Sequence, residues 1–227
     1  MTAPGPAPFL PGLALVAATT DAINFLGLGR VFTANMTGNT VLLGVGVASG
    51  DHTAALRSAT ALGGFLLGTA VGAAIGGQGR SFATALGVEL GVIIAWYAWW
   101  AAAGSAPRYG YVALSGVAMG IQSGAVTRLR VPGVSTTFIT GTMTSFSVQL
   151  VDRLLRRRPA PPGSTQPLRA VVLPCYVAGA FAGGYAFHFL GSGAVIVPLG
   201  VLAVLTAAAF LFPPARQEEE AGATATA

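Results

Sequence analysis

Six long apolar stretches dominate this chain of 227 residues. A helix rises about 1.5 Å per residue, so each stretch can cross the roughly 30 Å hydrocarbon core of a bilayer. Charged residues make up only 8% of the chain, whereas a soluble domain of this size carries about a quarter. The sequence therefore predicts an all-α, polytopic membrane protein. The six stretches are residues 9–28, 55–77, 82–103, 109–127, 170–190 and 193–212.

Two further segments are shorter and more polar. They are residues 35–49, NMTGNTVLLGVGVAS, and residues 135–151, STTFITGTMTSFSVQLV. A stretch with only about 10 to 14 apolar residues is more often re-entrant or buried in a bundle than exposed to lipid as a full span. We therefore expect six transmembrane helices plus two short broken or re-entrant helices.

The chain also contains an internal repeat. The letters TGNT at 37–40 are echoed by TGTMT at 140–144, and an arginine precedes each motif, Arg30 and Arg130. The apolar stretch that follows contains GFLLG at 64–68 in one half and GAFAG at 179–183 in the other. This order predicts an internal duplication. The predicted parts are an N-terminal tail (1–8), a first half (9–103), a second half (109–212) with an Arg-rich loop (152–169), and a disordered C-terminal tail (213–227).

The Arg-rich loop predicts the orientation. Arginines close to helix ends are retained on the cytoplasmic side, which places this loop and, with six spans, both termini in the cytoplasm. If the two short segments do not cross, the chain has six spans and its halves are inverted; if both cross, it has eight spans and parallel halves. The distribution of arginines favours six spans only slightly. The loop contains Arg153, Arg156, Arg157, Arg158 and Arg169.

Charge and cysteine content exclude several function classes. The formal net charge of +5 is spread over loops and the C-terminal tail, without the continuous basic face that nucleic-acid binding needs. Cys175 is the only cysteine, so the chain has no Cys/His cluster for a metal. An enzyme would need converging His, Cys or carboxylate groups, and Asp21 and Glu89 lie in different predicted helices. We expect no nucleic-acid partner, enzyme activity, cofactor or metal site.

Two segments carry a resemblance to a known family. They are DAINFLGLGRVFTANMTGNTVLLG, which starts at Asp21, and GIQSGAVTRLRVPGVSTTFITGTMT, which starts at Gly120. Over residues 11–212 the chain resembles the YoaK-type family of bacterial multi-pass inner-membrane proteins, a domain of unknown function. The family usually shows a Gln-Asn pair where this chain has Gln122-Ser123. The resemblance implies a location and an architecture, and no activity.

The two Thr-Gly motifs suggest a site for a solute. Glycine weakens a helix, while hydroxyl and amide groups can satisfy the backbone at a break. In transporters built from inverted repeats, paired broken helices meet near the midplane and form the solute site. We therefore predict a transporter or channel for an unknown small solute, with a polar midplane site. Its predicted residues are Asp21, Asn24, Asn35, Thr37, Gly38, Asn39, Thr40, Gln122, Thr136, Thr137, Thr140, Gly141 and Thr142.

The alternative is a non-transporting membrane scaffold or assembly factor, in which glycine and threonine only let helices pack closely and hydrogen-bond. A ladder of glycines along one helix face also permits close packing. This glycine pattern predicts either packing between the two halves or an interface between copies of the chain in a homo-oligomer. We favour internal packing because Gly179 and Gly183 repeat the pattern. The ladder consists of Gly64, Gly68, Gly72 and Gly76.

Two acidic residues lie inside predicted spans, where a carboxylate is costly and marks a functional site by default. Asp21 predicts coupling to a proton or cation or, alternatively, a structural group, protonated or bonded to Asn24, that caps the break. Glu89 is expected to pair with an arginine near a membrane face. His188, close to the end of its predicted helix, is expected at the membrane interface.

Overall fold

A computed structural model describes residues 7–77, 79–103, 108–131, 136–137, 139–155 and 165–214. All regular structure in these ranges is helical, with no strand among them, as predicted. The predicted N-terminal tail up to residue 6, the middle of the Arg-rich loop (156–164) and the C-terminal tail from 215 onward lie outside the described residues. The helices are α1 (Phe9–Gly27), α2 (Met36–Ser49), α3 (His52–Ile75), α4 (Arg80–Ala103), α5 (Arg108–Arg128), α6 (Ile139–Leu154), α7 (Gln166–Leu190), the 3-10 helix η1 (Gly191–Val195) and α8 (Ile196–Leu211).

Two closely packed helix pairs form the centre of the bundle. α1 packs along α7, and α3 packs along α5. A Cβ added to Gly64, Gly68 or Gly72 of α3 would collide with the backbone of α5. Gly179 and Gly183 of α7 approach the backbone of α1 in the same way. The prediction that the glycine ladder packs internally is therefore confirmed, since α3 and α5 belong to different predicted halves.

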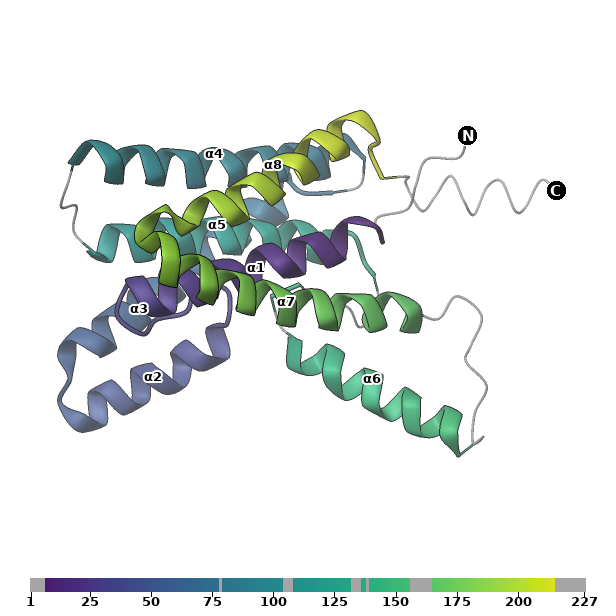
Figure 1. Cartoon of the computed structure of the whole chain (residues 1–227), viewed down its shortest axis with the longest axis horizontal. Helices are drawn as coiled ribbons and strands as arrows, with labels where there is room; N and C mark the ends of the chain where they lie inside the picture. The colour runs from purple at the N-terminus through teal and green to yellow at the C-terminus, as the bar shows by residue number, and fades with distance from the viewer. Residues whose placement is uncertain are drawn as a thin grey trace.

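α4 and α8 complete the bundle around an apolar core. α4 packs against α5 and α8, and α8 also packs against α1. At one end of the molecule the rings of Phe9 and Phe82 meet edge to face, with centroids 5.6 Å apart. Figure 1 shows that α1 begins and α8 ends at this same end. The largest fully buried apolar side chains include Leu10, Leu13 and Met119.

The two short helices extend outward from this bundle. In Figure 1, α2 and α6 each begin near the centre of the molecule and run outward toward opposite ends. α2 packs on α3, and α6 packs on α7. Arg57, in the second turn of α3, donates from Nη1 to the carbonyl oxygen of Gly29 at 2.9 Å. The chain therefore leaves α1 and enters α3 at the same end of the molecule.

The outer surface of the bundle is apolar. Leu67 and Phe189 are 68% and 76% exposed, and a surface of this kind is unusual for a soluble monomer. Four helical stretches in the described residues are long and apolar enough to cross a membrane. The fourth is 46 residues long and contains α7, η1 and α8. The four are Phe9–Gly27, His52–Ile75, Arg80–Trp99 and Gln166–Leu211.

The helix bounds differ from the predicted spans at a few ends. α3 begins three residues before the predicted start at 55, because the side chain of Asp51 caps it by accepting a hydrogen bond from the N–H of Ala54 at 3.0 Å. The last predicted span, 193–212, is divided: η1 carries the chain from α7 to Ile196, where α8 begins. Both short segments are helical: α2 begins one residue later than predicted, and α6 begins four residues later.

Candidate functional site

The chain turns back into the bundle directly after α1. Gly29 and Arg30 adopt positive φ angles of 90° and 62°, a conformation that is uncommon for any residue except glycine. Asp21 lies six residues before the end of α1, which is about 9 Å along the helix axis. The backbone of Thr33 and Asn35 lies beside Asp21. α2 therefore begins inside the bundle.

The carboxylate of Asp21 closes this break. Its Oδ1 accepts hydrogen bonds from the backbone N–H groups of Thr33 at 2.6 Å and Ala34 at 2.7 Å, and its Oδ2 accepts one from Asn35 at 2.9 Å. The side chain is only 4% exposed. Backbone N–H groups freed by a helix break need such acceptors, because lipid offers none. Asp21 therefore caps the break, which was one of the two roles predicted for it, but through backbone N–H groups: the amide of Asn24 donates to Thr33 and Ser115.

Two asparagines of the first motif also bind the backbone of the break. Asn39 pairs with Phe32 as another peptide group would: its Nδ2 donates to the carbonyl oxygen at 2.7 Å, and its Oδ1 accepts from the N–H at 3.0 Å. Asn35 precedes α2, and its Oδ1 accepts a longer hydrogen bond, 3.4 Å, from the N–H of Gly38. Side-chain acceptors at this position stabilise a helix start. The first motif thus holds the break in shape.

A buried polar cluster joins the first break to α5. Asn24 donates from Nδ2 to the hydroxyl oxygens of Thr33 at 2.8 Å and Ser115 at 2.6 Å. The hydroxyl of Ser115 in turn donates to that of Thr33 at 3.2 Å. All three side chains are buried. Of the three, only Asn24 was predicted as a site residue.

The break after α5 has corresponding features. Arg130 has a positive φ of 54°, as the arginine after α1 does. Gln122 lies six residues before the end of α5, and its Nε2 donates to the hydroxyl of Thr136 at 3.2 Å. The same Nε2 donates to the carbonyl oxygen of Leu13 at 3.1 Å. Gln122 therefore links the second break to α1, as Asn24 links the first break to α5.

The first turns of α2 and α6 place their predicted residues in matching ways. Thr37 and Thr140 are exposed, whereas Asn39 and Thr142 are buried. Gly38 and Gly141 are partly exposed, and Thr40 is exposed. Thr137 is buried and donates its hydroxyl to Ser123 at 3.2 Å. The buried residues of the two motifs, Asn39 and Thr142, thus lie close to the breaks, whereas Thr37 and Thr140 are exposed.

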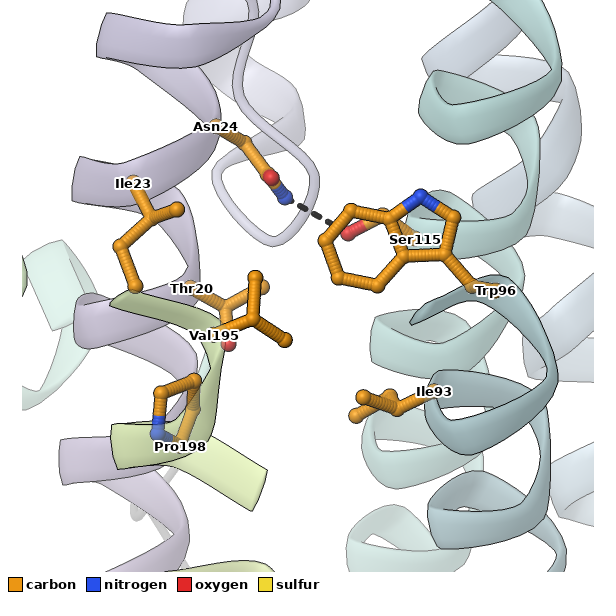
Figure 2. Close-up of a pocket in the computed structure, with 8 residues that line it drawn as sticks. All are labelled: Thr20, Ile23, Asn24, Ile93, Trp96, Ser115, Val195 and Pro198. Atoms are coloured by element: carbon orange, nitrogen blue, oxygen red, sulfur yellow. Dashed lines mark hydrogen bonds between the residues drawn. The ribbon is translucent and has the colours of Figure 1, made fainter. Parts of the chain in front are cut away.

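A small cavity lies beside the first break, between α1, α4, α5 and the start of α8 (Figure 2). Its volume is about 10 Å³, which is room for roughly one water molecule. Figure 2 shows the Asn24–Ser115 hydrogen bond at its edge. The lining residues are Thr20, Ile23, Asn24, Ile93, Trp96, Ser115, Val195 and Pro198.

Several buried polar atoms in this part of the bundle have no hydrogen-bond partner among the described residues. Thr20 Oγ1 and Trp96 Nε1 belong to residues of the cavity wall, and both carboxylate oxygens of Glu89 belong to the same helix as Trp96. The arginine partner predicted for Glu89 is therefore wrong: the side chain is fully buried, while the arginines of α4 and α5 lie at helix ends. Within the described ranges, no three His, Cys, Asp or Glu residues gather as a metal site.

Comparison with known proteins agrees with this architecture. Residues 9–208 match a protein family of unknown function, DUF1275. The chain belongs to this family. It is 29% identical over 201 residues to the UPF0700 transmembrane protein YoaK of Bacillus subtilis (strain 168), covering 84% of this chain and 89% of that protein. No solved structure matches. The predicted resemblance to the YoaK-type family is confirmed, and with it the membrane location.

Sequence reasoning missed two residues of the polar cluster in this DUF1275 protein. Thr33 had a usable signal, because aligning the two Thr-Gly motifs places Thr33 opposite Thr136, which was predicted. Ser115 had none. It lies in the first half of α5, 91 positions from its partner Asn24, and no local pattern distinguishes it from other small residues of that helix. Only the packing of α5 on the first break reveals its role.

Proposed function

We propose that this protein is a transporter or channel for a small polar solute in the bacterial inner membrane. The observation that carries the proposal is that α2 begins inside the bundle, and α6 near its centre, at breaks flanked by buried amide and hydroxyl groups. Lipid cannot satisfy a broken backbone, so such segments persist where protein or a water-filled cavity surrounds them. Paired broken helices form the solute sites of transporters with inverted repeats.

The proposal includes six spans in two inverted halves, with α1 to α4 equivalent to α5 to α8. In this scheme the first helix of each half packs along the third helix of the other, as α1 does on α7 and α5 on α3. α1 and α5 run in opposite directions in Figure 1, and so do α2 and α6. Arg30 and Arg130 share the positive φ at equivalent turns. Both termini then lie on the cytoplasmic side with the Arg-rich loop.

Cysteine labelling tests this topology. In a variant without Cys175, single cysteines replacing Arg30 and His52 should react with a membrane-impermeant reagent from the same, outer side. The hydrogen bond from Arg57 to Gly29 supports that expectation, because it joins the end of α1 to the start of α3. Labelling of the two positions from opposite sides would contradict six spans and favour eight.

The proposed solute site lies between the two breaks. The amides of Asn24 and Gln122 and the hydroxyls of Thr136 and Thr137 supply its buried polar groups. Asp21 belongs to it as a positioning residue, since both of its oxygens already hold the first break. The first turns of α2 and α6 complete the site with Asn35, Thr37, Gly38, Asn39, Thr40, Thr140, Gly141 and Thr142.

Flux measurements in reconstituted vesicles test the transport proposal. Wild-type protein should carry at least one solute from a panel of radiolabelled amino acids, sugars, carboxylic acids and inorganic anions. Thr136→Val should lower that flux at least several-fold, because it removes a buried hydroxyl that Gln122 binds without changing the side-chain shape much. Thr84→Val is the matched control: Thr84 is exposed on α4, and its hydroxyl bonds within its own helix.

The second candidate is a membrane scaffold or assembly factor, and the glycine contacts between α3 and α5 favour it. In that case the polar motifs only fasten helices. Thr136→Val would then lower thermal stability in detergent without any flux to lose. A folded wild-type protein that moves no member of the panel would contradict transport and support the scaffold.

A further inference from the structure

The inner face of α4 carries a single ionisable residue. Buried side chains recur along this face at helical spacing, and all except Glu89 are aliphatic or aromatic. Glu89 is 0% exposed, and neither of its carboxylate oxygens has a hydrogen-bond partner among the described residues. Buried positions of α4 are Phe82, Ala83, Ala85, Leu86, Glu89, Ile93 and Trp96.

In the helices packed against α4 the basic residues lie near helix ends, whereas Glu89 lies in the middle of α4. α8 contains no ionisable residue, and the only one in α1 is Asp21, which is bound to the first break. Those of α5 and α3 lie in the first or last two turns of their helices, Arg80 begins α4, and Tyr97 lies about two turns beyond Glu89. These are Arg108, Tyr109, Tyr111 and Arg128 in α5, His52 and Arg57 in α3, and Arg80 and Tyr97 in α4.

Among the residues that the structure describes, an ionised carboxylate in this position would have neither a counter-charge nor a hydrogen-bond donor. Burying such a charge is far more costly than burying the neutral acid. The described conformation therefore suits a Glu89 that carries a proton. Ionisation requires a second conformation in which water or a cation reaches the carboxylate.

The cavity beside the first break offers a route for that proton. Glu89 precedes Ile93 by one turn, about 6 Å along the helix axis, and both lie on the same face of α4. Ile93 and Trp96 line the cavity, as does Thr20, whose Oγ1 has no hydrogen-bond partner among the described residues. A water molecule in a cavity of this size needs two or more polar partners. The Asn24–Ser115 pair at its edge supplies such groups (Figure 2), and the hydroxyl of Thr20 belongs to a residue of its wall.

We propose that Glu89 is a proton-binding site that couples solute movement to the proton gradient. The inference rests on the proposed transport function. A proton from water enters by way of the cavity and adds to one carboxylate oxygen of Glu89, giving the neutral acid of the described conformation. In the alternate conformation water reaches the side chain, the proton leaves to it, and the carboxylate is hydrated. One proton moves per conformational cycle, and no covalent bond other than O–H forms or breaks.

Infrared spectroscopy of the full chain reconstituted in lipid tests the resident proton. The wild type should show the C=O stretch of a buried, protonated carboxyl group at neutral pH. Glu89→Gln should lose this band, and Glu89→Asp should keep it at a shifted frequency. Asp51→Asn, at an exposed helix cap, is the control and should leave the band unchanged. A wild type without the band, or a band that survives in Glu89→Gln, overturns the proposal. If Glu89→Gln does not fold, Glu89→Asp provides the test, and a band that does not shift in that variant overturns the proposal.

Transfer to D2O tests whether the proton moves. Exchange through the cavity predicts that the band shifts to the deuterated frequency while the protein stays folded. A band that remains protonated until the protein is unfolded would show a sealed structural acid and overturn the coupling role. Thr20→Val should slow the exchange, because it removes a hydroxyl from the cavity wall.

These measurements separate the two proposals. They require no solute, so a protein that passes them but moves nothing in the flux panel keeps the proton site and loses transport. Conversely, solute flux that responds to an imposed pH gradient equally in wild type and Glu89→Gln retains transport and removes Glu89 from it.

Discussion

Two carboxylates are buried inside this helical bundle, and their surroundings are opposite. Asp21 lies at a helix break and accepts three backbone N–H groups at 2.6 to 2.9 Å. Glu89 lies within an unbroken helix, and among the described residues neither of its oxygens is bonded. Asp21 has its donors built into the fold, so its bonds stabilise one conformation. Glu89 lacks them, so its ionisation depends on a change of conformation.

The difference separates a structural carboxylate from one available for function. A group whose hydrogen bonds are all satisfied contributes to stability, and its removal leaves buried partners unpaired. A buried polar group without hydrogen-bond partners does not stabilise the fold. Its presence calls for another explanation, such as a role in function. The two regions should therefore respond to substitution in opposite ways: stability should fall at Asp21, and function should fall at Glu89.

The largest expected effect is that of Asp21→Ala. It would leave two buried N–H groups and one partly buried N–H group without an acceptor, which costs about 3 kcal/mol at about 1 kcal/mol for each group. We expect a large fall in the thermal midpoint in detergent and in membrane yield. Asp21→Asn keeps one acceptor oxygen and should fall between Asp21→Ala and wild type.

Asp51→Ala is the control for this effect. Asp51 also accepts a backbone N–H, that of Ala54, but at an exposed helix cap. Its loss should cost about 1 kcal/mol. If Asp21→Ala is no more destabilising than Asp51→Ala, the carboxylate does not hold the break, and the contrast with Glu89 fails.

A smaller loss of stability is expected for Asn39→Ala. Asn39 makes two hydrogen bonds to the backbone of Phe32 on the far side of the same break. Their removal should cost about 1 to 2 kcal/mol, measured as the shift in the detergent unfolding midpoint. Thr40→Ala is the matched control in the next position, because its exposed hydroxyl bonds only to Met36 in its own helix. Equal effects of the two substitutions would show that the break is held by Asp21 alone.

Glu89→Gln should change stability by less than about 1 kcal/mol, since no hydrogen bond is lost and a neutral group replaces a neutral acid. Its expected effect is on gradient-driven flux, which should disappear while uptake down a solute gradient remains. The pair Asp21→Asn and Glu89→Gln is informative because both exchange a carboxyl for an amide. A larger loss of stability in Glu89→Gln than in Asp21→Asn would reverse the assignment of the two carboxylates.

Much of the fold could be predicted from the sequence. The surroundings of Asp21 and Glu89 could not, because they depend on contacts between residues that are distant in the chain. Apolar length and glycine spacing are local, so the helical class, the short segments and the packing of Gly68 on α5 could be predicted. The donors to Asp21 lie 12 to 14 positions along the chain, in an irregular segment that positive φ angles at Gly29 and Arg30 turn inward. No periodicity encodes such a turn. The surroundings of Glu89 come from separate helices and depend on packing alone.

The smallest expected effect compares two adjacent threonines of α1. Thr19 donates its hydroxyl to the carbonyl oxygens of Leu15 and Gly179, whereas the Oγ1 of Thr20, at the cavity, has no partner among the described residues. Valine has nearly the shape of threonine, so each substitution removes little except the hydroxyl. Thr19→Val should cost about 0.6 kcal/mol, the average for a hydrogen bond between membrane helices. Thr20→Val should leave stability unchanged or raise it slightly, because an unpaired buried hydroxyl is unfavourable. Both shifts can be read from unfolding in mixed micelles, and a greater loss for Thr20→Val than for Thr19→Val would mean that the region around Glu89 is hydrogen-bonded after all.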